Sequence, residues 1–333
     1  MSRYSWTLCS FCCFLFCCQS PGKEKAITDP IQVNAFVSLL EYDLESLEEE
    51  IQELAVFTES LFKEKEKWLA KADPDRFLIE NNMANTAPNQ DPEFSSIYIS
   101  TLSTNPKAIR ELVKFTHPLD EKFKAIVNDH DVVTQVYYNS VLQVNRLYPP
   151  YDVAAMLEPD LDLTSFNFFY QADEKNNPGR GSVWVDEIYI DPVGKGWMMS
   201  LLHPVYVEDK LEMVLGFDIT VNDIIQFYLD KTTEQLVIID GEGTLVAGKS
   251  KAIEALSLPP LKNHTYLQTI TADSFRIEDF NLFKSKSQEV RKMASHFILS
   301  KGKYYLLDEG TEKIHITGRK MNKFNWYILD LDL

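Results

Sequence analysis

A single acidic residue inside an apolar stretch is the strongest chemical signal in this sequence. Asp218 lies within VLGFDITV, which otherwise has the composition of a buried strand. A carboxylate taken out of water needs a hydrogen-bonding or charged partner. An ammonium group suits it, because it offers donors and a positive charge but no acceptor. We expect a ligand contact; the alternatives are that Asp218 caps a helix starting near Val221 or points to solvent.

Aromatic residues precede Asp218 and could wall a pocket around such a ligand. Four of them are candidates: Phe169, Tyr170, Trp184 and Tyr189. A cation above an aromatic ring gains about 0.5 to 2 kcal/mol. We expect these rings, with help from Asp191, to hold a small amine or amino-acid-like cation. Two alternatives stay open: Trp184 and Phe169 are equally typical of a plain core, and Asp191, in IDPVGKG, could merely cap a turn.

Patterns typical of enzymes and metal sites do not occur. The six histidines are scattered, and the sequence has neither an HExxH nor a GxSxG motif. All five cysteines lie in LCSFCCFLFCCQS, with no later Cys or His cluster to complete a zinc site. The formal net charge of −17 opposes nucleic-acid binding and favours cationic partners. We therefore expect a protein without enzymatic activity, cofactor or metal.

The cysteine-rich stretch reads as an export signal. Arg3 precedes an apolar run that ends near Cys17 and is followed by polar residues. Leu15 to Cys18 resembles the lipobox of bacterial lipoproteins, although Cys17 stands where that family has Gly, Ala or Ser. The resemblance implies lipidation of Cys18, with Cys17 as the alternative, and a membrane-anchored protein of the periplasm or cell surface. Simple secretion and an uncleaved anchor are the other interpretations.

A long helix should follow the signal. Apolar residues recur every three or four positions, broken only at Thr58: Val33, Val37, Leu40, Leu44, Leu47, Ile51, Leu54 and Leu61. Counted from Ile31 to Leu69, the helix would measure about 55 to 60 Å at 1.5 Å per residue. This length exceeds one small domain, so we expect it to brace two modules. A coiled-coil dimerisation rod is the alternative.

The rest of the chain alternates strand-like and helical segments, which predicts an α+β fold with antiparallel sheets. The clearest strands are 132–141, 182–190, 197–207 and 212–221, and a hairpin is expected at 236–248. We divide the chain into a signal (1–18), a linker (19–30), the long helix (31–75) and two modules (76–230 and 231–333).

Three fragments together resemble the double Cache domain, an extracytoplasmic ligand sensor with two PAS-like sheets on a long helix. They are FFYQAD (168–173), VW..EIYIDP.G.GWMMS...PVY (183–206) and GFDIT (216–220). The resemblance extends over about residues 31 to 333. It implies that a ligand binds in the membrane-distal module, 76–230, and that 231–333 is membrane-proximal.

The resemblance also implies roles for particular residues. Amino-acid-binding members hold the ligand carboxylate with an Arg, a Trp and a Tyr, and its ammonium group with a Tyr and an Asp. Their positions correspond here, in that order, to Asn167, Phe169, Tyr170, Tyr189 and Asp218. Because Asn167 replaces the Arg, an amine is favoured over an α-amino acid, unless Arg146 or Arg180 reaches in from a loop. Neutral or purine-like ligands are a further alternative.

Sensors of this family continue into a second membrane helix and a signalling domain. This sequence ends at Leu333, after WYILDLDL. We therefore expect the protein to act through a separate membrane kinase, receptor or transporter. The alternative is a structural lipoprotein that uses the same scaffold for protein contacts without a small ligand.

Overall fold

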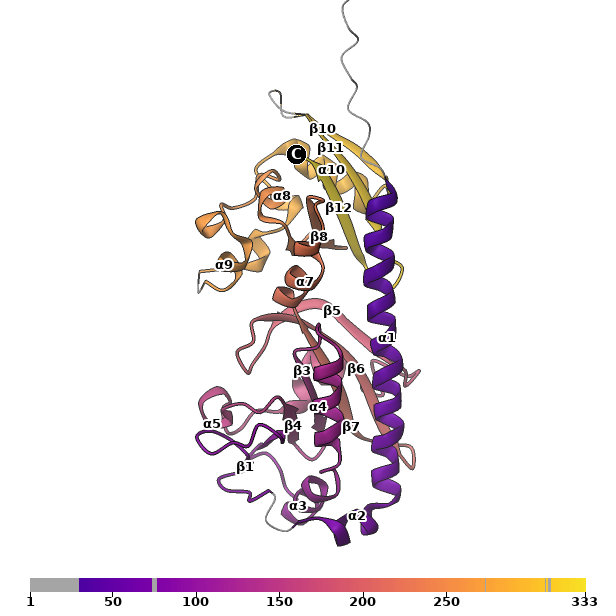
Figure 1. Ribbon diagram of the computed structural model, residues 1–333, viewed down its shortest axis with the longest axis vertical. Helices are drawn as coiled ribbons and strands as arrows, with labels where there is room; N and C mark the ends of the chain where they lie inside the picture. Colours follow the sequence, from indigo (N-terminus) through magenta and orange to yellow (C-terminus); the bar gives the residue numbers. More distant parts are fainter. Residues whose placement is uncertain (1–29, 74–76, 273, 309, 311–312) are drawn as a thin grey trace, which may run out of the picture.

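One long helix, α1 (Pro30–Lys63), runs beside two antiparallel sheets (Figure 1). The computed structural model describes residues 30–73, 77–272, 274–308, 310 and 313–333. The predicted signal (1–18), with its lipidation site Cys18, and all but the last residue of the linker (19–30) lie outside these ranges. The α+β class and the arrangement of two antiparallel sheets along a helix are confirmed.

The apolar stripe of α1 is buried along its whole length. Its residues from Val33 to Leu61 are each at most 3% exposed. Thr58, which interrupts the stripe, is also buried, and its hydroxyl donates to the Leu54 carbonyl at 2.7 Å. The helix is not continuous to Leu69, because it ends at Lys63 and a second helix, α2 (Lys65–Lys71), follows.

The first sheet has seven strands in the order β1-β2-β4-β3-β7-β6-β5. Their bounds are β1 Met83–Ala84, β2 Ser96–Ile99, β3 Gln135–Ser140, β4 Val144–Tyr148, β5 Val183–Ile190, β6 Trp197–Val207 and β7 Lys210–Thr220. Strand β4 is followed directly by a pair of prolines. Pro149 and Pro150 follow the strand and end it, so they interrupt no ladder.

Helices cover one face of this sheet, and short turns cover the other (Figure 1). The first group consists of α1, α3 (Pro106–Phe115) and α4 (Leu119–Asp129), and the second of α5 (Val153–Met156), η1 (Leu163–Ser165) and α6 (Asn167–Tyr170). Because side chains alternate along a strand, Tyr138 and Phe217 pack on the helical side, whereas Tyr137 packs on the side of the turns.

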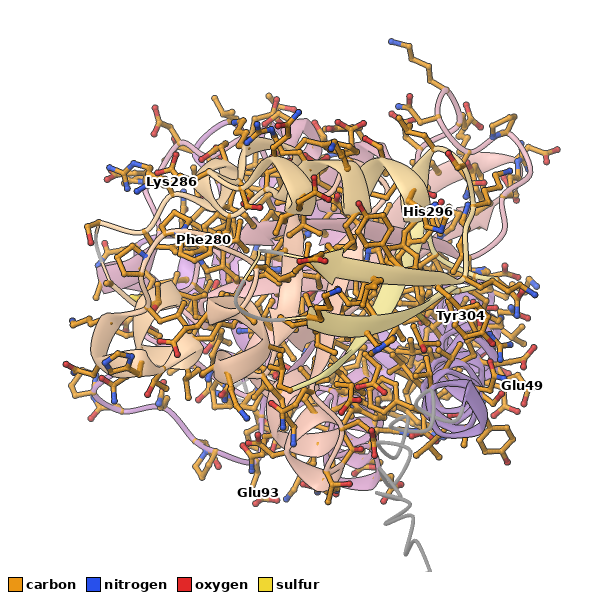
Figure 2. The ribbon with its side chains drawn as sticks, turned by 90° about the horizontal axis from the view of Figure 1, so that it is seen from above. Glu49, Glu93, Phe280, Lys286, His296 and Tyr304 are labelled. Atoms are coloured by element: carbon orange, nitrogen blue, oxygen red, sulfur yellow. The ribbon has the colours of Figure 1, made fainter. Side chains whose placement is uncertain are left out.

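The second sheet has five strands in the order β10-β11-β12-β8-β9. Their bounds are β8 Leu236–Asp240, β9 Leu245–Gly248, β10 Tyr304–Asp308, β11 Lys313–Lys320 and β12 Trp326–Asp332. The associated helices are α7 Val221–Phe227, η2 Leu229–Lys231, α8 Ser250–Glu254, η3 Lys262–His264, α9 Tyr266–Ile270, η4 Ile277–Asp279, η5 Leu282–Lys284 and α10 Gln288–Ile298. Figure 2 looks onto this end of the molecule, with β10 and β11 nearest the viewer.

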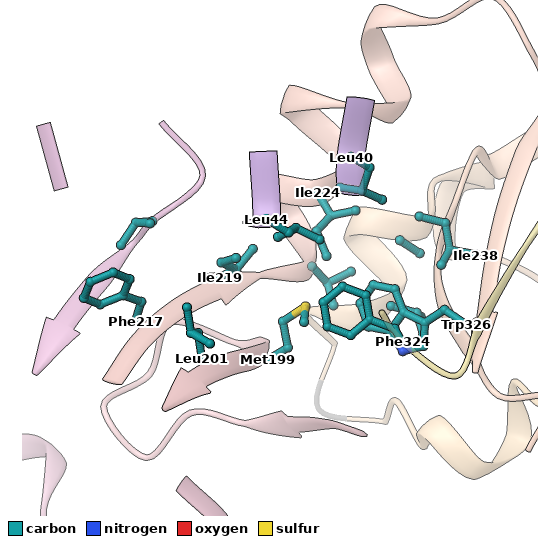
Figure 3. Close-up of a cluster of buried hydrophobic side chains, with 14 of the residues drawn as sticks. Leu40, Leu44, Met199, Leu201, Phe217, Ile219, Ile224, Ile238, Phe324 and Trp326 are labelled. Atoms are coloured by element: carbon teal, nitrogen blue, oxygen red, sulfur yellow. The ribbon is translucent and has the colours of Figure 1, made fainter. Parts of the chain in front are cut away.

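The two sheets and α1 share one hydrophobic core (Figure 3). At the junction, Leu40 and Leu44 of α1 lie close to Met199 of β6 and Trp326 of β12. Hydrogen bonds tie the same helix to both modules: the Trp184 indole donates to Glu48 at 2.7 Å, and Lys323 pairs with the other oxygen of Glu48 at 3.0 Å. The helix therefore braces both modules, as its length predicted.

Candidate functional site

A cavity lies between the first sheet and the short turns that cover it. The cavity is small, with a volume of about 40 Å³. The lining is largely apolar and aromatic: Gln135, Tyr137, Asn139, Asn145, Leu147, Tyr151, Leu157, Leu161, Leu163, Phe166, Phe168, Tyr189, Asp191, Pro192, Val193 and Asp218. These lining residues include two carboxylates and no Lys, Arg or His.

Asp218 lies on β7 with its side chain on the cavity face of the sheet. It is 3% exposed and accepts a hydrogen bond from the Ser200 hydroxyl at 2.5 Å; Ser200 in turn lies 2.5 Å from the Tyr189 hydroxyl. Burial, and then the charge of Asp191, raise the pKa of Asp218 well above its usual value, and the nearby hydroxyls offset this only in part. Asp218 therefore neither faces solvent nor caps α7, whose N-terminal cap is Thr220.

Asp191 lines the cavity and also holds the turn between β5 and β6. Its two oxygens accept from the backbone N–H groups of Val193 at 3.0 Å and Lys195 at 2.9 Å. The Gln135 amide donates to it across 3.4 Å. Burial raises the pKa of Asp191, although these hydrogen bonds act in the opposite direction. Asp191 therefore does both: it caps the turn, as the alternative interpretation stated, and it lines the cavity.

Two further polar atoms at the cavity lack hydrogen-bond partners of good geometry: the Gln135 carbonyl oxygen and the Tyr137 hydroxyl. Gln135 pairs with Asp218 across β3 and β7, and the Tyr137 hydroxyl lies close enough to Ser200 and Asp218 to influence their ionisation. A buried polar group without a partner costs about 1–3 kcal/mol. The cavity thus presents several acceptors that a hydrogen-bond donor from a ligand would satisfy.

Gly216 makes room for the Tyr137 ring. A Cβ atom at Gly216 would lie 2.2 Å from the Cζ atom of Tyr137, its cross-strand neighbour. The ring therefore occupies the space beside the glycine and forms a wall of the cavity, with an edge-on contact to Phe168 at 6.2 Å between ring centres.

Replacing Gly216 with alanine is expected to displace this ring. Overpacking of this kind costs about 1–3 kcal/mol of unfolding free energy, and the moved ring would narrow the cavity. Thermal unfolding measures the loss. Gly181→Ala is the matched control, because a Cβ there meets nothing within 4 Å. Equal stability of the two variants would contradict this role of Gly216.

Three of the seven residues expected to bind the ligand line the cavity: Tyr189, Asp191 and Asp218. The other four lie elsewhere. Asn167 accepts from the backbone N–H of Phe168, Phe169 is packed in the core, and Tyr170 is 40% exposed. Trp184 faces α1 and packs edge-on against Phe324 at 5.1 Å.

Phe166 and Phe168 supply the aromatic wall where Phe169 and Tyr170 were expected. The ring centres of Phe166 and Phe168 lie 4.8 Å apart in a stacked arrangement, and the Phe168 ring centre also lies 5.8 Å from that of Tyr189. The rings that line the cavity therefore come slightly earlier in the chain than expected. The segment from η1 to α6 is short and irregular, and its local conformation determines which rings point to the sheet.

The polar lining of the cavity has a signal in the sequence. Gln135, Tyr137 and Asn139 alternate along β3, and Asn145 faces Asn139 from β4. Polar groups recurring at every second strand position mark one shared face of the sheet.

Neither arginine considered as a carboxylate clamp lines the cavity. Arg146 is fully buried on the opposite face of the sheet, where it donates to Asp120 at 2.8 Å and to the Val113 carbonyl at 2.7 Å. Arg180 is partly exposed and pairs with Asp209 at 3.0 Å. The alternation of side chains along β4 sends Arg146 away from the turns, because its neighbours Asn145 and Leu147 take the cavity face.

Comparisons with known proteins find similarity only at the level of solved structures: no family model and no curated protein matches. The sensory domain of the Campylobacter jejuni chemoreceptor Tlp3 (CcmL), solved with isoleucine bound, is 14% identical, with a TM-score of 0.43 over 93% of this chain and 97% of that chain. The ligand-binding domain of the Pseudomonas aeruginosa PAO1 amino-acid chemoreceptor PctB, solved with L-Gln, is 12% identical, with a TM-score of 0.41 over 70% and 78%.

A third similar structure is the ligand-binding domain of the Pseudomonas fluorescens chemoreceptor CtaA in complex with L-isoleucine. It is 10% identical, with a TM-score of 0.43 over 64% of this chain and 75% of that chain. Similarities this distant do not establish what this chain binds.

Within the described ranges, no helix combines the length and apolar character needed to cross a bilayer. The same residues contain no group of three or more His, Cys, Asp or Glu side chains arranged to hold a metal ion.

Proposed function

We propose that the protein binds a small organic cation carrying a primary ammonium group in the cavity beside Asp218. One observation carries this proposal. Two buried carboxylates, Asp218 and Asp191, line the same cavity, and no basic residue is among its lining residues. The charge of Lys195 acts on Asp191, but an ionised Asp218 would have no counter-charge among the lining residues. A bound ammonium group would supply that charge, together with three hydrogen-bond donors.

The acceptors favour a primary amine over a quaternary one. A primary ammonium group could donate to Asp218 and to the Gln135 carbonyl oxygen, which has no partner. A trimethylammonium group has no N–H, so it would leave the Gln135 carbonyl oxygen without a donor and would add no hydrogen bond to Asp218 beyond the one from Ser200. The faces of Tyr137, Tyr189 and Phe168 could add cation–π attraction of about 0.5–2 kcal/mol.

The small volume of the cavity and its apolar wall favour a short aliphatic body on the ligand. Leucines at 147, 157, 161 and 163 line the side of the cavity formed by β4 and the turns. A ligand carboxylate would find no cation among the lining residues, and two carboxylates would repel it. An amine without a carboxylate is therefore the preferred class, and an α-amino acid the weaker one.

A ligand panel tests this proposal. Thermal unfolding is measured with short primary alkylamines, with alcohols of the same shape, and with α-amino acids. A ligand at 100 times its dissociation constant stabilises the folded state by about 2.7 kcal/mol, so the amines should raise the melting temperature and the alcohols should not. If neither the amines nor the amino acids change the melting temperature, the proposal fails and the structural scaffold replaces it.

Binding should also depend on pH. Because the pKa of Asp218 is raised in the free protein, a proton must leave before the cation can pair with the carboxylate. We expect the affinity to fall by about tenfold per pH unit as the pH drops below that pKa. Calorimetric titration of one alkylamine across pH 5 to 8 measures this. An affinity independent of pH over the whole range would mean that Asp218 is ionised throughout or is not the partner.

The biological setting follows from the sequence as part of the same proposal. The protein would be exported, anchored through a lipid on Cys18, and would report occupancy of its cavity to a separate membrane kinase, receptor or transporter. Labelling with a radioactive fatty acid, compared between the wild type and Cys18→Ala, tests the anchor. If both are labelled, Cys17 is the modified residue.

A further inference from the structure

A second cavity lies on the other module, in a groove of about 540 Å³ beside the start of α1. It is lined by Val33, Asn34, Phe297, Lys301, Gly302, Lys303, Tyr304, Thr317, Gly318, Arg319, Lys320 and Tyr327. Four of these residues are basic and none is acidic, although the chain has 50 acidic and 33 basic residues. Figure 2 shows Tyr304 next to the end of α1 in the view onto this module.

Neutral groups hold two of the four cations in place. Arg319 donates to the Asn34 side-chain oxygen at 2.6 Å, and the Lys320 ammonium group lies 5.7 Å from the centre of the Tyr327 ring. Among the described residues, none of the four has a carboxylate within 4.0 Å. In contrast, Lys313 and Lys323 at the two ends of the β11 region do pair with acids, Lys313 with Asp308 and Lys323 with Glu48.

Like charges gathered around one groove repel each other, and an anion relieves that repulsion. Arginine supplies a planar fork of donors that matches phosphate oxygens, and lysines act as point charges. Because the rest of the chain is strongly acidic, a free anion would be attracted to this groove and repelled elsewhere.

We propose that this groove is a binding site for a phosphate-bearing anion, independent of the amine cavity. Lys301, Lys303, Arg319 and Lys320 surround the phosphate, and Asn34 orients the Arg319 fork. The phosphate could belong to a soluble molecule or to an anionic lipid headgroup.

Calorimetric titration with pyrophosphate at constant ionic strength tests the site. We expect saturable binding that weakens as salt is added, because screening acts on these exposed charges. The double variant Lys303→Gln and Lys320→Gln should weaken binding by about tenfold or more, since it removes two of the charges that attract the anion. Both lysines are exposed, so the variant should unfold at the wild-type temperature.

The matched control removes two lysines outside the groove, Lys262→Gln and Lys284→Gln, which are also exposed. It should leave pyrophosphate affinity within about twofold, because remote exposed charges are screened. Asp218→Asn should likewise leave it unchanged. Equal weakening by the groove and control variants would overturn the site.

Vesicles distinguish the two sources of phosphate. Co-sedimentation with phosphatidylglycerol vesicles, beyond that with phosphatidylcholine, and its loss in the groove variant would identify a lipid headgroup. Pyrophosphate binding without this preference would identify a soluble ligand. If the chain binds neither pyrophosphate nor phosphatidylglycerol vesicles through these lysines, the proposal is wrong.

Discussion

Replacing Asp218 with asparagine is expected to weaken amine binding by about 10 to 100-fold, since a hydrogen bond to a charged group contributes about 1.5–3 kcal/mol. The fold should survive, because the asparagine oxygen can still accept from Ser200, which lies 2.5 Å from the Asp218 oxygen. Its amide could in addition donate to the Tyr137 hydroxyl, which has no partner of good geometry. Calorimetric titration of the wild type and the variant with the same amine measures the change.

The stability of this variant without ligand provides a separate test. A carboxyl group whose pKa is raised by folding contributes stability that is fully present below its unfolded pKa and is lost as the pH rises through its folded pKa. Asp218 follows this rule because burial raises its pKa. Asp218→Asn should therefore gain stability relative to the wild type as the pH rises above about 4.

Denaturant unfolding at several pH values measures this gain. Asp209→Asn on the surface is the control, because the side chain of Asp209 is 91% exposed. The account would be contradicted if the difference in unfolding free energy between Asp218→Asn and the wild type did not change with pH. The pKa of the Asp218 carboxyl group would then be the same in the folded and the unfolded chain.

Arg146→Ala should cause the largest loss of stability, about 3–5 kcal/mol, which is typical when one partner of a buried ion pair is removed. Both side chains of the Arg146–Asp120 pair are fully buried. Without the guanidinium group, Asp120 would keep its backbone donor from Ser95 at 3.1 Å but lose its counter-charge. The Phe77 ring, 4.7 Å from the guanidinium carbon, would lose its contact as well.

The exposed pair of Arg180 and Asp209 provides the comparison. Arg180→Ala should change stability by no more than about 1 kcal/mol, as is usual for surface ion pairs. Replacing Arg146 and Asp120 together by Met and Leu should recover much of the loss, because it leaves no buried charge alone. Loss of ligand binding by Arg146→Ala with undiminished stability would instead make Arg146 a ligand-binding residue.

Regular elements could be predicted from the sequence because their signals are local and repeated. The stripe from Val33 to Leu61 defined one face of α1, and 197–207 coincides with β6. The predicted strand at 212–221 corresponds to β7, which places Asp218 in the middle of the sheet. Periodicity of this kind does not depend on distant parts of the chain.

The wall of the cavity could not be predicted in the same way. Phe166 and Phe168 lie in short turns without periodicity, so their order in the sequence does not show which rings face the sheet. Trp184 was expected in the pocket, but its side chain lies on the side of β5 that packs against α1. The Trp184 indole donates a hydrogen bond to Glu48, 136 positions away in the sequence. The ion pair between Arg146 and Asp120 could not be predicted for the same reason, because it depends on how β4 packs against α4.

A crystal structure of the chain with a short primary alkylamine tests the central claim most directly. The account predicts the amine nitrogen in the cavity within about 3 Å of an Asp218 carboxylate oxygen, as in charge-assisted hydrogen bonds. It also predicts the alkyl chain against Phe168 and the leucines. An empty cavity at saturating amine, or an amine bound with its nitrogen away from Asp218, would contradict it.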